Sequence, residues 1–248
     1  QAIESVVNQT YLDWELLIVD DGSTDGTAKV VESFLENPKI KYLKNFNASG
    51  VAGTINSGLK HATGNYFARL DSDDVWILPE KLEKQVQFLD NNAKFVLVGT
   101  WATAGFEPLQ REYFFSHALS DNDIKKHILL RNPFVSSSIM VKMDALKQVG
   151  EYDVSGFLAE DYGLVLRLGR IGQVANLNLR AVWYRLSNQS ISSTQYYDQV
   201  YYAHKMVKKL GSEYPYYRLA LLKWRLHLIL VKLGASNLIY KLKQRNYL

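Results

Sequence analysis

The chain has 248 residues, of which 47% are hydrophobic and 22% charged, so it can fill the core of one large domain or of two small ones. This composition excludes disordered and collagen-like chains. Cysteine is absent, which excludes disulfide scaffolds, zinc ribbons and thiol nucleophiles. Any metal must therefore be held by oxygen or imidazole ligands.

The net charge of +4 is distributed unevenly along the chain. Residues 1–198 hold 19 Lys and Arg against 24 Asp and Glu, whereas residues 199–248 hold 10 against 1. A basic tail on an acidic body indicates contact with an anionic surface, either a membrane or a nucleic acid. The alternative is a solvated helix face. No nucleic-acid-binding motif is present, so we expect no nucleic-acid partner.

Short apolar runs alternate with helix-period stretches in the first hundred residues. Strands are predicted at residues 15–19, 40–43, 66–70 and 95–98. Helices are predicted at 27–35, at 51–61 and from Pro79 onward. This alternation predicts an α/β fold with a mostly parallel central sheet and helices on both faces.

The periodicity weakens after about residue 105. Here we predict helices at 124–131 and 160–168 and strands at 137–141 and 181–186. No linker or repeat separates the two halves. Residues 1–198 are therefore interpreted as one domain with halves 1–105 and 106–198, followed by a basic helical tail at 199–248.

The tail carries two apolar helix faces. One comprises Leu219, Leu222, Leu226, Ile229, Leu230 and Leu233, and the other Leu221, Trp224, Leu228 and Val231. We expect one face to pack on the body and the other to meet a membrane interface or a second protomer; burial of both in a bundle is the alternative. Charged residues interrupt the tail, so no spanning helix is expected. The first residues lack a secretory signal, so we expect a cytoplasmic protein, peripheral on the inner face of the cell membrane.

Carboxylates follow two of the predicted strands. Asp20 and Asp21 end the first, and Asp71, Asp73 and Asp74 follow the third. Ligands bind at the carboxyl ends of such strands. Several like charges close together are unfavourable unless a cation neutralises them, and all-oxygen ligation suits Mg²⁺ or Mn²⁺. The alternative is a solvated acidic turn that caps the following helix.

A third acidic pair, Glu160 and Asp161, begins an apolar helical run. These carboxylates can cap the helix or act as a general base. The sequence lacks G-x-x-x-x-G-K-[ST] and G-x-G-x-x-G, so P-loop and dinucleotide-binding sites have no support.

Four stretches together resemble the family 2 glycosyltransferases of the GT-A fold, which are inverting enzymes. They are A-I-E-S-V-V-N-Q-T-Y at 2–11, W-E-L-L-I-V-D-D-G-S-T-D-G-T at 14–27, A-R-L-D-S-D-D at 68–74 and A-E-D-Y at 159–162. The similarity runs from residue 2 to about residue 193. The family opens with an apolar strand upstream of the segment at 2–8, so the resemblance implies that this strand is absent from the chain.

The resemblance also implies a role for each acidic residue. Asp20 and Asp21 contact the base or ribose of the donor, with Asp21 preferred. Asp73 holds the metal, Mn²⁺ or Mg²⁺, on the donor diphosphate, and Asp71 helps with the ribose or the metal. Asp161 takes the proton from the acceptor hydroxyl, with Glu160 as the second choice.

The sequence departs from the family at two serines. Ser136 and Ser187 stand where the family often carries His. The resemblance implies that a contact with acceptor, phosphate or metal is lost at these places.

The leading hypothesis is a metal-dependent inverting glycosyltransferase that moves a sugar from a nucleotide-diphospho-sugar, a UDP-sugar, to a hydroxyl of a glycan or lipid-linked glycan. Its partners are the donor, the acceptor and, through the basic tail, a membrane or another protomer. The alternative hypothesis is an inactive sugar-nucleotide-binding or scaffolding domain.

Overall fold

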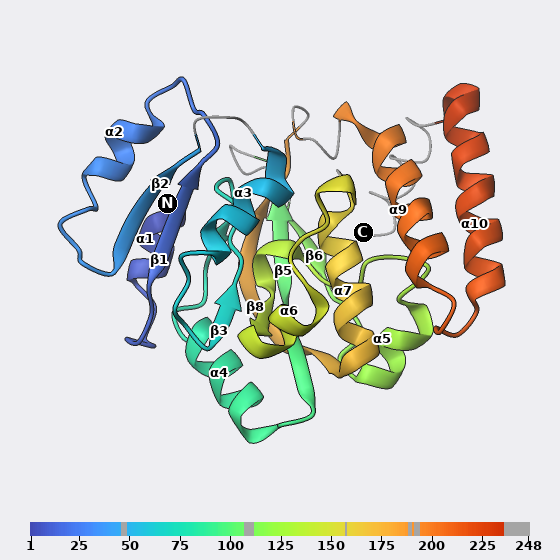
Figure 1. Ribbon diagram of the computed structural model, residues 1–248, viewed down its shortest axis with the longest axis horizontal. Helices are drawn as coiled ribbons and strands as arrows, with labels where there is room; N and C mark the ends of the chain where they lie inside the picture. Colours follow the sequence, from blue (N-terminus) through green and yellow to red (C-terminus); the bar gives the residue numbers. More distant parts are fainter. Residues whose placement is uncertain (46–48, 107–111, 157, 188–189, 191–193, 236–248) are drawn as a thin grey trace.

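The computed structural model describes residues 1–45, 49–106, 112–156, 158–187, 190 and 194–235 (Figure 1). The end of the predicted basic tail, 236–248, and residues 188–189 of the segment around Ser187 lie outside the described residues. The α-helices are α1 (Ala2–Val7), α2 (Thr27–Glu32), α3 (Gly50–Leu59), α4 (Lys81–Asn91), α5 (Asp121–His127), α6 (Met143–Val149), α7 (Glu160–Ile171), α9 (Tyr196–Leu210) and α10 (Tyr217–Leu230). The strands are β1 (Leu16–Asp20), β2 (Ile40–Lys44), β3 (Tyr66–Ala68), β4 (Val75–Trp76), β5 (Phe95–Gly105), β6 (Glu112–Phe115), β7 (Met140–Lys142) and β8 (Gln173–Arg185).

The predicted alternation of strands and helices up to residue 98 is confirmed, with boundaries shifted by a few residues. β5 is longer than predicted, because it continues to Gly105. The sequence pattern missed β4, β6 and α6. They have two, four and seven residues respectively, so each offers few positions over which apolar periodicity can be detected.

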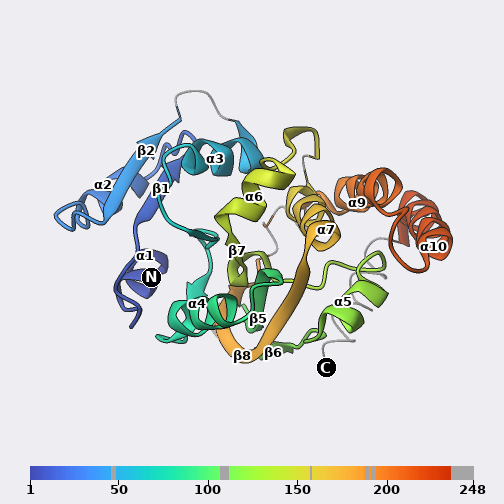
Figure 2. The same ribbon diagram turned by 60° about the horizontal axis from the view of Figure 1, so that its bottom comes forward.

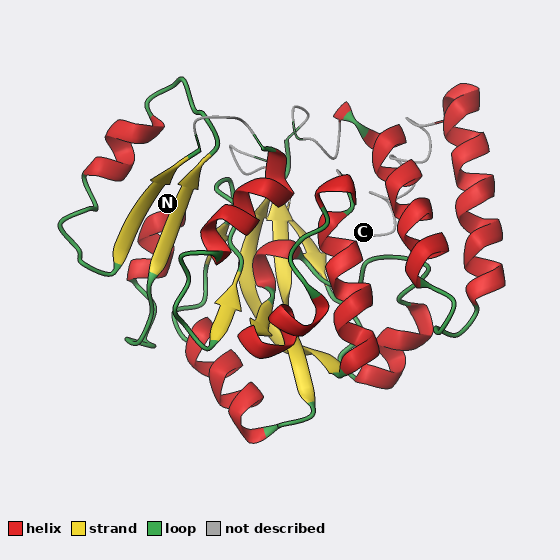
Figure 3. Cartoon of the chain, viewed as in Figure 1, coloured by secondary structure: helices red, strands yellow, loops and turns green. Residues whose placement is uncertain are grey.

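The prediction of a mostly parallel sheet is wrong for the larger sheet. Its strand order is β3-β7-β5-β8-β4, with β6 also paired to β5. Figure 3 shows the strands in yellow and the helices that surround them in red. Among the strands of this sheet that the structure describes, β5 and β8 pair in parallel, whereas β3–β7, β5–β7, β5–β6 and β4–β8 are antiparallel. Only residues 106–111 connect β5 to β6, and that is too short for a crossover helix, so this pair must run antiparallel.

β1 and β2 form a separate two-stranded parallel sheet. Figure 1 shows this pair beside the larger sheet, with α2 on its outer side and α3 between the two sheets.

Helices cover both faces of the larger sheet, as predicted. Leu97, Val141 and Val174 belong to a core shared with α5, α6, α7 and α9. Their neighbours Val98, Met140 and Ala175 belong to a second core shared with α1 and α4. This alternation follows from the two-residue period of a strand.

The tail forms two helices at one edge of the molecule, where α9 packs on α7 and α10 packs on α9 (Figures 1 and 2). Trp224 of α10 is buried, and its indole Nε1 donates a hydrogen bond of 2.8 Å to the Leu129 carbonyl. The face with Leu221, Trp224, Leu228 and Val231 packs inward, as expected for one of the two apolar faces. Over the part of the chain that the structure describes, no helix combines the length and the apolar character needed to span a bilayer.

Candidate active site

Acidic residues from three distant parts of the sequence line one cleft of about 1850 Å³. Asp21 follows β1, Asp71 and Asp73 follow β3, and Asp161 lies in the first turn of α7. The predicted convergence of these carboxylates is therefore present in the geometry. Asp20 and Asp74 are not among the lining residues described.

Asp21 is held at the start of α3. Its carboxylate accepts hydrogen bonds from the backbone amides of Ser49 and Gly50 at 3.0 Å each and from Asn45 Nδ2 at 3.1 Å. Burial acts to raise the pKa of Asp21, but these hydrogen bonds outweigh it and the pKa is lowered. Asp21 therefore faces the cleft as a fixed negative charge.

Asp20 is turned away from the cleft into the neighbouring loop. It accepts hydrogen bonds from the amides of Gly22 and Ser23, at 3.2 and 2.7 Å, and from the Tyr42 hydroxyl. The Tyr42 hydrogen bond, with those of Ser23, lowers the pKa of Asp20 to about 2. Asp20 thus shapes the turn that presents Asp21.

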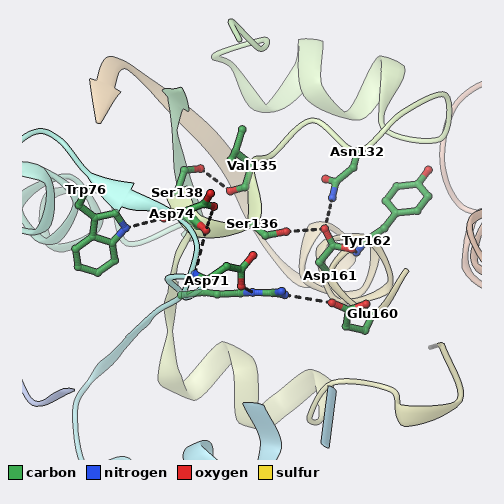
Figure 4. A network of polar contacts seen from close by, with 12 residues as sticks. Asp71, Asp74, Trp76, Asn132, Val135, Ser136, Ser138, Glu160, Asp161 and Tyr162 are labelled. Carbon is green, nitrogen blue, oxygen red and sulfur yellow. Dashed lines mark hydrogen bonds and ion pairs between the residues drawn. The ribbon is translucent and has the colours of Figure 1, made fainter. Parts of the chain in front are cut away.

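The loop after β3 is fixed by the buried Asp74. One oxygen of Asp74, which Figure 4 labels, accepts the Ser137 hydroxyl. The other oxygen accepts the Arg185 amide at 3.0 Å. Ser137 Oγ in turn accepts the Asp71 amide at 3.1 Å, and the Ser137 carbonyl accepts Trp76 Nε1 at 2.8 Å. Burial, together with the charges of Asp71 and Asp73, raises the pKa of Asp74 to about 7. The side chain thus serves as an internal brace of the loop.

The carboxylate oxygens of Asp71 and Asp73 are suitable ligands for a divalent cation. Burial, then the charge of Asp71, raises the pKa of Asp73, so the ionised carboxylate is in an unfavourable site that a cation would relieve. Among the described residues, no group of three or more acidic or histidine side chains is arranged to hold a metal. Mg²⁺ commonly binds through one or two carboxylates, with substrate phosphates and water completing its shell. The two aspartates fit that mode of binding.

Arg69 connects the loop after β3 with α7. Its Nε lies 2.8 Å from Asp71 Oδ1, and one terminal nitrogen lies 3.4 Å from Glu160 Oε1. The guanidinium is buried and lies over the Tyr152 ring, 5.9 Å from its centroid. One buried cation therefore pairs with two of the predicted site carboxylates (Asp71 and Glu160 in Figure 4).

Asp161 is oriented by three hydrogen bonds. Its Oδ2 accepts Asn132 Nδ2 at 2.9 Å and Ser136 Oγ at 2.8 Å, and its Oδ1 accepts the Tyr162 amide at 2.7 Å (Figure 4). The N-cap of α7 is Ala159, with no side-chain capping bond, so neither Glu160 nor Asp161 occupies the cap position. Asp161 is thus held at the cleft wall in one orientation.

Glu160 is more buried than Asp161 and differs in its partners. Burial, followed by the charge of Asp161, raises the pKa of Glu160 to about 7, although Arg69 opposes the shift. Because Glu160 is buried and paired with Arg69, its main role is structural. This favours Asp161 over Glu160 as the carboxylate that acts on a substrate.

Sequence reasoning missed the residues that hold the acidic groups: Arg69, Asn132, Ser137 and Arg185. For Arg69 a signal existed, because a charged residue stands within an apolar strand pattern directly before D-S-D-D. In the sequence Ser136 stands out only as a departure from the family, but its hydroxyl donates directly to Asp161.

Solved glycosyltransferase structures share this architecture. S. aureus TarS residues 1–349 in complex with UDP gives a TM-score of 0.66 at 18% identity, covering 90% of this chain and 65% of that one. The mannosyltransferase PcManGT from Pyrobaculum calidifontis, in complex with GDP-Man and Mn²⁺, gives 0.66 at 16% identity, covering 91% and 64%. The molecule thus has the GT-A fold, as the resemblance implied.

Comparison at the sequence level then places the chain in a family. The profile described as "Glycosyl transferase family 2" matches residues 1–148. An Escherichia coli relative, UDP-Glc:alpha-D-GlcNAc-diphosphoundecaprenol beta-1,3-glucosyltransferase WfgD, is 34% identical over 198 residues, which span 79% of this chain and 74% of the relative. The chain belongs to glycosyl transferase family 2.

Proposed function

We propose that the chain is a metal-dependent inverting glycosyltransferase that transfers a sugar from a UDP-sugar to a hydroxyl of a glycan or lipid-linked glycan. The observation that carries the proposal is the convergence of Asp21, Asp71, Asp73 and Asp161 on one cleft. The name of the WfgD relative, a UDP-glucose-dependent enzyme with a lipid diphosphate acceptor, supports the nucleotide and the acceptor class.

The donor is proposed to lie along the two aspartate-bearing strand ends. Asp21 contacts the base or ribose, with Asp20 fixing the turn beside it. Asp73 and Asp71 would hold Mn²⁺ or Mg²⁺ on the diphosphate. A bound cation there neutralises the charge that develops on the leaving nucleoside diphosphate.

Asp161 is proposed as the general base. It accepts the proton of the acceptor hydroxyl, whose oxygen then forms a bond to the anomeric carbon of the donor sugar. The bond from that carbon to the diphosphate oxygen breaks, its electron pair leaves with UDP, and the anomeric configuration inverts. Asn132 and Ser136 keep the Asp161 carboxylate pointing at the acceptor throughout. No covalent enzyme intermediate is required.

A lipid-linked acceptor places the reaction at a membrane. We propose that the protein works at the cytoplasmic face of the cell membrane as a peripheral protein, with the basic tail at 199–248 as its contact. The excess of Lys and Arg in that tail supports attraction to anionic lipid.

Substitution of the base tests this function. Asp161→Asn should lower kcat by about 10² to 10⁴, the contribution of a positioned general base, with UDP affinity unchanged. UDP release with Mn²⁺ and a panel of UDP-sugars and acceptors measures kcat, and calorimetric titration with UDP measures binding. Asp144→Asn, an exposed change in α6, is the matched control. Equal turnover in the Asp161→Asn variant and the control would refute the assignment.

A further inference from the structure

The outward side of α10 and the start of the following segment is apolar and uncovered. Its members share one helix side and are 48% to 77% exposed: Leu219, Leu222, Leu226, Ile229, Leu230 and Leu233. We call this set the α10 outer face. Six large aliphatic side chains in one continuous stripe exceed the isolated apolar residues that an ordinary surface carries.

Basic residues run along one border of the α10 outer face. Arg218, Arg225 and Lys232 recur at seven-residue intervals, so they form a row beside the leucines, and all three are exposed. None of the three forms an ion pair with an acidic side chain in the portion of the chain described here. The Lys232 ammonium lies 5.9 Å from the centroid of the Tyr197 ring, a contact that leaves its charge uncompensated.

The segment that carries the face has no acidic residue of its own. The sequence from Tyr214 to Leu248 contains no Asp or Glu. A helix with an apolar stripe, a basic border and no acid has the character of an interfacial helix, which lies in the plane of a bilayer with its apolar side among the acyl chains.

We propose that the α10 outer face docks on an anionic lipid bilayer, with α10 lying flat on the surface. The inference deepens the proposed function, on which it rests for its lipid-linked acceptor. A second copy of the chain fits less well, because a twofold contact through this face would bring two basic rows together with no carboxylate to pair with them.

The position of α10 permits such docking. It is the outermost helix at its edge of the molecule, with α9 between it and α7 in both views (Figures 1 and 2). Its opposite side is anchored to the body by Trp224, Ala220 and Val231, which are buried. The part of the stripe on α10, from Leu219 to Leu230, extends about 16 Å at the rise of an α-helix. Docking therefore needs no rearrangement of the core.

Sedimentation with lipid vesicles tests the proposal on the full chain. Binding should be strong to vesicles of phosphatidylcholine mixed with phosphatidylglycerol and weak to phosphatidylcholine alone. Leu222→Ser combined with Leu226→Ser should lower the partition coefficient about tenfold or more. Arg225→Gln should lower it about fivefold at low salt and have little effect at high salt. Leu12→Ser, at an exposed leucine remote in sequence, is the control and should bind as the parent chain does.

Three results would overturn the proposal. They are absence of binding to the anionic vesicles, equal binding by the double leucine variant, and a concentration-dependent dimer in lipid-free solution that the double leucine variant abolishes. UDP release measured with a water-soluble acceptor separates this inference from the proposed function. The leucine variants should keep that activity, whereas failure of the parent chain in the same assay with intact vesicle binding would count against the transferase function alone.

Discussion

Arg69 shows how one side chain can organise this cleft. Its guanidinium meets Asp71 through Nε and Glu160 through a terminal nitrogen, and these partners belong to the loop after β3 and to α7. Lysine has a single point charge and cannot present separate donors in this fixed fork. Because the cation is buried, loss of it would leave Glu160 without a compensating charge in a desolvated place.

Removal of that cation should destabilise the fold. Arg69→Met is expected to lower the free energy of unfolding by about 3 kcal/mol, since it leaves a buried carboxylate unpaired. Combined with Glu160→Gln, which removes the stranded charge, the variant should recover part of that loss. Urea unfolding of the parent chain, both single variants and the double variant measures the coupling. Strictly additive effects would show that the 3.4 Å pair contributes nothing.

The acidic residues of the cleft could be predicted from sequence, but their supports could not. Asp71, Asp73 and Asp161 stand in short local patterns. Ser137 and Ser136 reach Asp74 and Asp161 across 63 and 25 residues, and nothing in their own neighbourhood marks those partners. Hydrogen bonds between side chains so far apart depend on the tertiary fold, which a local pattern does not encode.

At the scale of elements, α4 contains a buried amine. Lys81 is fully buried; its Nζ donates to Gln85 Oε1 at 2.8 Å and lies 4.0 Å from the centroid of the Trp76 ring. Gln85 Nε2 then donates to the carbonyls of Val98 and Ser138, at 3.2 and 2.8 Å. This chain of contacts fastens α4 to β5 and to the turn that carries Ser137.

The buried amine makes stability depend on pH. Burial lowers the pKa of Lys81 from 10.5 to about 7. Between these values the unfolded chain binds one proton more than the folded chain, so the contribution of Lys81 to the free energy of unfolding rises with pH from about 7 to about 10.5. Lys81→Met should remove this rise, and Lys84→Met, on the exposed side of α4, should keep it. Chemical unfolding at several alkaline pH values is the measurement; identical pH slopes for the parent and Lys81→Met would contradict it.

The type of most elements was predictable, whereas their directions were not. Alternating apolar runs identify strands, but parallel and antiparallel neighbours have the same two-residue period. The three-residue strand β7 enters between β3 and β5 and runs opposite to both. Its insertion follows from the packing of residues 140–142 against strands more than 40 residues away in sequence, and periodicity carries no information about that.

At the scale of the whole molecule, the residues that line the cleft come from two separate sheets and from α7. β1 and β2 form one sheet and β3 to β8 the other, yet Asp21 comes from the first, Asp71 and Asp73 follow a strand of the second, and Asp161 comes from α7. A ligand that reaches all of them joins the two sheets. Its binding energy should therefore appear as stability of the entire chain.

Thermal unfolding with UDP and Mn²⁺ tests whether a ligand in the cleft stabilises the entire chain. A ligand at about 100 times its Kd adds about 2.7 kcal/mol to the free energy of unfolding, which raises the Tm by several degrees in a chain of this size. UDP with Mn²⁺ should raise the Tm more than UDP with a chelator. Without the cation, the negative charge of the diphosphate lies uncompensated beside Asp71 and Asp73. Asp73→Ala should abolish the metal-dependent part of the rise and Asp144→Ala should leave it intact. If the Asp73→Ala variant kept the full Mn²⁺-dependent rise, the cation would bind elsewhere and the loop after β3 would lose its assigned role.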